Sequence, residues 1–249
     1  MRHGRLVFAG ALVRVADVTC HAGRGGCGAE EHSDAPQIVI PRRGVFTVHR
    51  GRQAVTADPM TAIVLHGDYR VSHPADGGDR CTVLVLAPEL HQEALRGACV
   101  LRASHRLAIS HATELLEAEE QVLHFVADLS GARPLREGRR VQEVREILAA
   151  RPTERWTLAG ISHAVHTSPY HLARQFRAAT GQTIARYLLG LRLALALDRL
   201  QEGQDDLARL AADLGFASHS HFSERFRATF GTPPSQVRKI LTARNLLAT

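Results

Sequence analysis

Thiol and imidazole side chains gather in the N-terminal third of the 249-residue chain. Cys20, Cys27 and His32 lie within 13 residues of one glycine-rich stretch, and His73 and Cys81 follow on later segments. Such side chains are ligands of zinc and copper in proteins. Their spacing matches no short zinc motif, and free cysteines usually behave as small buried hydrophobes. The sequence therefore leaves two interpretations open, a metal or redox site and ordinary packing.

A second set of chemically capable residues lies in an internal repeat. Residues 168–181 (SPYHLARQFRAATG) recur as residues 218–231 (SHSHFSERFRATFG), with six of 14 positions identical. Each copy follows a short apolar segment, at 158–165 and at 207–214. The pattern predicts a helix, a tight turn and a second helix, present twice.

The spacing within each copy separates an inner from an outer face. Leu172 and Phe176 are four residues apart, as are Phe222 and Phe226, so each pair should pack against the preceding helix. The opposite face carries hydroxyl, guanidinium and carboxylate groups, which can pair with base edges and phosphates in a major groove. The residues predicted to contact DNA are Ser168, Tyr170, Ala173, Arg174, Arg177, Ser218, His219, Ser220, Ser223, Glu224 and Arg227.

Within this set, residue chemistry suggests different roles. Arginine suits guanine and glutamate accepts from the cytosine amino group, so Arg174 and Glu224 are the expected base readers. Ser168 and Ser218 stand at helix starts, where hydroxyl and amide groups suit phosphate. Any amphipathic helix has a polar side, and one copy alone would indicate only a helical hairpin. Two copies in a basic region favour DNA binding.

The charge distribution agrees with a polyanionic partner for the second half. The formal charge is +6, and residues 137–249 hold 16 basic and 10 acidic side chains, whereas residues 1–136 hold 15 of each. Strong nucleotide bias in the genome is an alternative source of this excess, because 30 of the 31 basic residues are arginine. Charge alone therefore does not decide the function.

Two kinds of element must position these residues. From 37 to 87, short β-branched runs alternate with Gly, Pro and Asp, which predicts an all-β sandwich or barrel. Helical periodicity follows at 109–129, and 130–138 has the composition of a boundary. We expect domains at 1–130 and 139–249 with a linker at 131–138. Seven helices are predicted after the linker, at 138–150, 155–166, 168–179, 183–202, 206–213, 219–229 and 235–243.

The C-terminal part resembles the AraC/XylS family of bacterial transcription regulators over about its last 110 residues. The resemblance rests on SPYHLARQFRAATG, on TIARYLLGLRLALALDRL and on LARLAADLGFASHSHFSERFRATFGTPPSQVRK. It implies two helix-turn-helix units joined by a long helix, reading successive major grooves of double-stranded promoter DNA. Val237, where the family usually has an aromatic residue, and Glu224 depart from the family pattern.

Residues from about 18 to 87 resemble the cupin-like sensor half of such regulators. The expected fold is therefore α+β, with an N-terminal cupin-like β-barrel, a helical connector and an all-α C-terminal domain. The resemblance also implies an unidentified small-molecule or metal effector, RNA polymerase as a partner, and a homodimer. The helix around 113–129 is expected either to pack within its domain or to form the dimer interface.

Several other classes are disfavoured by the sequence. The apolar run at 6–13 is eight residues long, against about 20 for a membrane span, and no secretion signal is recognised, so we expect a cytoplasmic protein. Cupin-type metalloenzymes use a His-x-His pair, which residues 1–136 lack, so no enzyme is expected. A DNA-architectural module is the remaining alternative, although the two repeats differ in their outward residues. DNA binding requires no cofactor, and zinc or another metal is a possible ligand of the cysteine and histidine residues.

Overall fold

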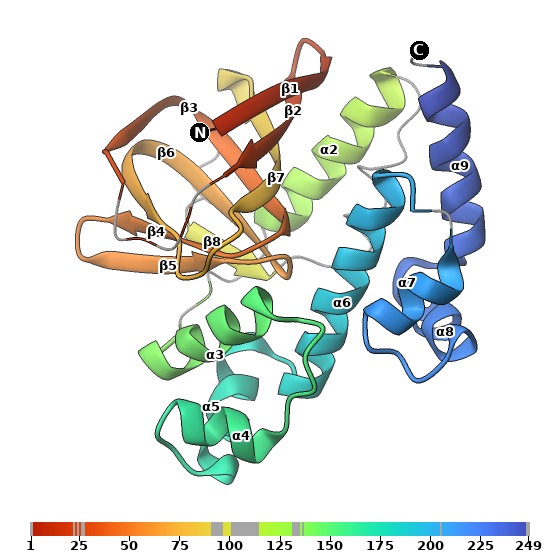
Figure 1. Cartoon of the computed structure of the whole chain (residues 1–249). Coiled ribbons are helices and arrows are strands. Elements are labelled where there is room, and N and C mark those ends of the chain that lie inside the picture. Colours follow the sequence, from red (N-terminus) through yellow and green to blue (C-terminus); the bar gives the residue numbers. More distant parts are fainter. Residues whose placement is uncertain are drawn as a thin grey trace.

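Strands form the first part of the chain and helices the second, as Figure 1 shows for the computed structural model. The structure describes residues 2–21, 23, 25, 28–90, 97–100, 115–130, 135, 137–204 and 206–247. The α+β prediction with two parts is confirmed. The predicted linker lies largely outside the described residues, which include only 135, 137 and 138 of its eight positions.

Eight strands form one antiparallel sheet in the described residues. Seven follow one another in the order β1-β2-β7-β3-β6-β4-β5, and β8 pairs with β6 beside this path. Their bounds are β1 Arg2–Ala9, β2 Val13–Cys20, β3 Glu31–Arg43, β4 Phe46–Arg50, β5 Gln53–Ala57, β6 Thr61–Ser72, β7 Asp79–Leu86 and β8 Gly97–Val100. A short 3₁₀ helix, η1, covers Pro88–Leu90.

The predicted closed barrel is wrong. β6 changes partners along one edge, pairing with β8 from Thr61 to Val64 and with β4 from Arg70 to Ser72. The sheet divides there, and the β4–β5 hairpin packs over one face of the remaining strands. The end strands β1 and β5 do not pair with each other in the described residues, so the sheet stays open.

Alternating side chains explain how both faces of the sheet are buried. On β3, Ile38 and Ile40 face one cluster and Val39 faces the other, as expected for a strand period of two. The first cluster is completed by helix α2 (Leu115–Ser130) through Val122, Phe125, Val126 and Leu129. The second is completed by Phe46 and Val48 of the hairpin. Helix α2 therefore packs within the N-terminal part, one of the two roles predicted for it.

Strands β1 and β2 were not predicted from the sequence. In β2, buried Val13 and Val15 flank exposed Arg14, which is the alternation of a half-buried strand. That signal is short and is followed by the small and polar residues Ala16 and Asp17. Pairing of β2 with β7 over the full length of both strands supplies the stability that the local pattern lacks.

All seven helices predicted after residue 137 are present. They are α3 Arg139–Ala150, α4 Leu158–Ala164, α5 Pro169–Thr180, α6 Ile184–Gln201, α7 Leu207–Asp213, α8 His219–Phe230 and α9 Pro234–Leu247. Helix α4 is shorter than predicted because Thr157 caps its start and His166 adopts a positive φ just beyond its end. Among the helices that the structure describes, none has the length and apolar character needed to cross a membrane.

The two parts of the chain share a core. Val45 and Met60, from turns of the sheet, belong to the same buried cluster as Val144, Phe176 and Leu191 of the helices. Helix α6 lies between the two helix-turn-helix units and contacts β3 of the sheet (Figure 1). The units are α4–α5 with α3, and α7–α8 with α9.

Candidate nucleic-acid interface

The two repeat copies fold into matching second helices with the same end structures. Ser168 and Ser218 are N-caps, and their Oγ atoms accept hydrogen bonds from the amides of His171 and His221 at 3.2 and 3.1 Å. Both helices end at a glycine in the left-handed region, at Gly181 and at the repeat-equivalent position 231. The repeat therefore encodes two helices of equal length with equal boundaries.

The inner face of each copy is anchored as predicted. Leu172 and Phe176 are fully buried against α3, α4 and α6 in one cluster. Phe222 and Phe226 are fully buried in a second cluster with Leu210 and the other residues of α6, α7 and α9. Because these apolar side chains fix the rotation of each helix about its axis, the opposite face must point to solvent.

The outer faces match the predicted stripes. Tyr170 is 78% exposed, which is unusual for a large aromatic side chain. Ser223 is half-buried and lies 3.4 Å from His219 Nε2 through its Oγ. The other predicted contact residues are all exposed, namely Ser168, Ala173, Arg174, Arg177, Ser218, His219, Ser220, Glu224 and Arg227. The structure thus leaves every predicted DNA-contact residue at least partly accessible.

The turns inside the two units have the same backbone but different residues. In the first unit the amides of His166 and Thr167 bond to the carbonyls of His163 and Ser162. In the second, the amides of Gly215 and Phe216 bond to the carbonyls of Ala212 and Ala211, which are three and five residues earlier, as in the first unit. The left-handed position holds His166 at φ 51° in one turn and Gly215 at φ 74° in the other.

Arg192 of α6 holds the two units in a fixed relation. Its guanidinium donates to the carbonyls of Pro152 and Glu154, before α4, at 2.8 and 2.9 Å. It also donates to the carbonyl of Gly215 in the turn of the second unit at 3.2 Å. Burial lowers the pKa of Arg192 from its ordinary value. One side chain therefore bridges the approach to the first unit and the turn of the second.

A buried polar network joins the sheet to the first unit. Arg145 of α3 is inaccessible to solvent, and its Nε donates to Asp58 Oδ2 at 3.0 Å. Tyr187 of α6 donates its hydroxyl to the same carboxylate at 2.7 Å. Glu137 and the carbonyl of Thr56 accept from the other guanidinium nitrogens at 2.6 and 2.8 Å. The sequence did not single out Arg145 or Asp58, which are 87 positions apart.

A second ionic cluster joins the sheet to the C-terminal half of α6. Arg42 and Arg80 each lie 3.6 Å from Asp198 Oδ1, and Arg80 also pairs with Glu202. Burial raises the pKa of Asp198, although the two guanidinium groups oppose this effect. The helix that connects the two units is therefore bound to the sheet at two places.

The metal candidates from the sequence are separated by the fold. Cys20 and His73 come together with Asp79, which the sequence analysis missed. Cys81 is buried and its Sγ donates to Asp79 Oδ1 at 3.2 Å. His32 lies outside this group and bonds to Asp68 and Asp34, while Cys27 lies outside the described residues. No local signal indicated Asp79, because only the pairing of β2 with β7 brings it opposite Cys20.

Two helix-turn-helix units held by one connecting helix, each with an accessible polar face on its second helix, define a double helix-turn-helix protein. A family model described as a helix-turn-helix domain matches residues 161–240. An AraC-like transcription regulator of Streptomyces lividans is 36% identical over 88 residues, which are 35% of this chain and 29% of that protein. The regulator YidL of Escherichia coli is 34% identical over 101 residues, covering 41% of this chain and 34% of that protein.

The C-terminal part of the chain is therefore similar to the helix-turn-helix domain of AraC-like transcription regulators. The match spans only about a third of the length of these relatives, which are regulators and not enzymes. Among solved structures, ToxT from Vibrio cholerae is similar with a TM-score of 0.43 and 12% identity, over 93% of this chain and 100% of that one.

Proposed function

We propose that this protein is a sequence-specific, effector-responsive regulator of transcription that places α5 and α8 in successive major grooves of promoter DNA. The observation that carries the proposal is the pair of equal units whose exposed faces differ. The first presents Tyr170, Arg174 and Arg177, and the second presents Ser220 and Glu224. Two units of similar backbone with different base-contacting side chains suit an asymmetric DNA site. Successive major grooves in such a site are about 34 Å apart.

The N-terminal part is the proposed sensor. The buried network at Arg145 and the ionic cluster at Asp198 both connect it to the DNA-binding half. A ligand that binds two arrangements of this interface with different affinity would shift DNA affinity by at most that difference in binding free energy. Homodimerisation, contact with RNA polymerase and a cytoplasmic location complete the proposal and rest on the family resemblance.

The test of sequence-specific binding is selection of bound sites from random double-stranded DNA by the full-length protein at fixed salt. We expect one asymmetric motif that spans two successive grooves. An architectural module that binds without sequence preference would enrich no motif. That outcome would overturn the proposal.

Arg174→Ala tests the base-reading role. We expect binding to the selected site to weaken by about 1–3 kcal/mol, with relaxed preference at one base pair, because a bidentate arginine contact reads one guanine. The matched control is Arg70→Ala, an arginine of the sheet whose side chain is 55% exposed, which should leave DNA affinity unchanged. Equal weakening on every sequence would reassign Arg174 to a phosphate contact.

A further inference from the structure

Three different metal-binding groups meet at one end of the sheet. Cys20 is the last residue of β2, Asp79 is the first residue of β7, and the two lie directly opposite each other in the β2–β7 ladder. His73 follows β6 and forms a backbone bridge with Gly25 of the glycine-rich stretch. The end of β2, which is distant in sequence, and the connection from β6 to β7 therefore bring these side chains to one point.

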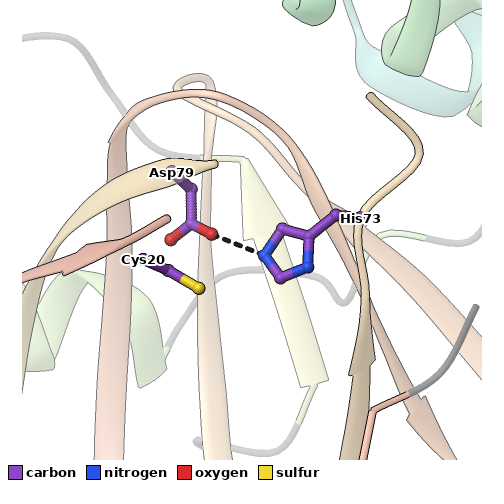
Figure 2. A group of neighbouring side chains, drawn as sticks. All are labelled: Cys20, His73 and Asp79. Atoms are coloured by element: carbon purple, nitrogen blue, oxygen red, sulfur yellow. Dashed lines mark hydrogen bonds and ion pairs between the residues drawn. The ribbon is translucent and has the colours of Figure 1, made fainter. Parts of the chain in front are cut away.

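The ligand atoms are close enough to share one ion. The Cys20 sulfur, a His73 ring nitrogen and an Asp79 oxygen all lie within 4.8 Å of one another. His73 Nε2 lies 2.8 Å from Asp79 Oδ2, and Figure 2 shows the sulfur and the carboxylate on the same side of the imidazole ring. Tetrahedral zinc with bonds of about 2.0–2.3 Å needs ligand atoms about 3.5 Å apart, so side-chain adjustments of about 1 Å suffice.

The surroundings suit a bound ion more than an ordinary surface pair. The side chains of His73 and Asp79 are only 12% and 8% exposed. The Cys81 thiol donates to the second oxygen of Asp79 at 3.2 Å and so orients the carboxylate. Asp79 and Cys81 also line a cavity of about 230 Å³, together with mainly apolar residues of the sheet. A histidine–aspartate pair alone is a common contact. With a thiol as the third donor, the three groups form a set of ligands that binds metal ions.

We propose that Cys20, His73 and Asp79 bind a divalent transition-metal ion of the zinc class. Thiolate, imidazole and carboxylate are each ligands of Zn²⁺, and three protein ligands leave a fourth position for water or a further group. Binding requires loss of the thiol proton and a neutral imidazole nitrogen, so uptake of the ion releases protons.

The position of the site connects it to the DNA-binding half. Asp79 precedes Arg80, which pairs with Asp198 of α6 and with Glu202, the C-cap of that helix. The backbone before Asp79 is tightly packed, because a Cβ added at Gly44 would collide with the carbonyl oxygen of Gly78. An ion that draws Asp79 toward Cys20 therefore acts one residue away from the ion pairs that connect the sheet to α6, the helix between the two units. This second step, metal-dependent DNA affinity, rests on the proposed function.

Metal binding is tested first and without DNA. Full-length reduced protein is stripped with a chelator, exchanged into metal-free buffer and titrated with Co²⁺ as a spectroscopic probe, and then with Zn²⁺ in competition. We expect one ion per chain, a thiolate-to-cobalt charge-transfer band, and displacement by Zn²⁺. Cys20→Ser should remove the band, and His73→Gln and Asp79→Asn should each weaken binding at least tenfold.

Two controls keep the result specific. His32→Gln removes an exposed histidine outside the group and should bind as the parent does. Circular dichroism of each variant checks that it is folded. Unchanged Co²⁺ affinity in folded Cys20→Ser and His73→Gln, or a parent spectrum without a thiolate band, would overturn the proposed site.

DNA affinity then tests the coupling. With the selected site, we expect the parent Kd to differ at least fivefold between Zn²⁺ and chelator, and the difference to vanish in Cys20→Ser. Stoichiometric metal binding with equal Kd values would mean a structural ion and would overturn the coupling. If no DNA site can be selected, the proposed function fails, but the cobalt titration still decides the metal site.

Discussion

At the scale of single residues, the Asp58 carboxylate has two buried donors that come from different helices. Arg145 Nε and the Tyr187 hydroxyl both donate to it, at 3.0 and 2.7 Å. Burial raises the pKa of the Tyr187 phenol well above its ordinary value, and the neighbouring Asp58 raises it further. Tyr187 therefore remains a neutral donor at physiological pH and satisfies a buried anion.

Tyr187→Phe should lower the free energy of unfolding by about 1.5–3 kcal/mol, because a hydrogen bond to a buried charged group is lost without loss of packing volume. The measurement is urea unfolding of the full chain. Tyr170→Phe is the matched control, since that hydroxyl belongs to a 78% exposed side chain and its loss should leave stability unchanged. Equal unfolding midpoints for parent and Tyr187→Phe would show that Arg145 and the Met60 amide satisfy Asp58 without the hydroxyl.

At the scale of elements, the turns of the two units differ in the backbone strain that they carry. Both place one residue in the left-handed region, which costs an L-residue with a side chain about 1 kcal/mol relative to glycine. The first turn has His166 there and the second has Gly215. A Cβ at Gly215 would also lie 3.3 Å from the carbonyl oxygen of Thr153.

Substitutions at these two positions should therefore change the free energy of unfolding in opposite directions. His166→Gly should raise the free energy of unfolding by up to about 1 kcal/mol, and Gly215→Ala should lower it by at least that amount. Both are measured by urea unfolding of the full chain. A destabilised His166→Gly variant would mean that the imidazole makes contacts worth more than the strain it carries.

At the scale of the whole molecule, the contact between the sheet and α6 contains a poorly solvated charge. The Asp198 side chain is inaccessible to solvent, and neither of its carboxylate oxygens has a hydrogen-bond partner among the described residues. Arg42 and Arg80 approach it only at 3.6 Å. Burial thus raises the pKa of Asp198 despite the two cations, and the ionised form disfavours the folded state.

This shift predicts the sign of a pH dependence. The folded state holds the Asp198 proton more tightly than the unfolded state, so the free energy of unfolding falls as pH rises from about 4 through the raised pKa. Asp198→Asn removes this contribution. The stability of the variant relative to the parent should therefore increase over that range and then level off, as measured by urea unfolding at a series of pH values. A constant difference between the two proteins would contradict the assignment.

Much of the C-terminal part was determined by the sequence itself. The helices, their capping residues Ser168 and Ser218, the buried pair Leu172 and Phe176, and the exposed stripe around Arg174 all follow from patterns within about 15 residues. Such patterns are readable because helical hydrogen bonds and caps join residues that are near in the chain. Whether the exposed residues contact DNA stays a prediction.

Only the tertiary structure decided how distant segments meet. The open sheet depends on β6 pairing with β8 and β4 on one edge, and the meeting of Cys20 with Asp79 depends on the β2–β7 register. The burial of Arg145 against Asp58 likewise joins positions 87 apart. Strand pairing and interface ion pairs have no short sequence signature, because the partner of each group is selected by global packing and not by its neighbours in the chain.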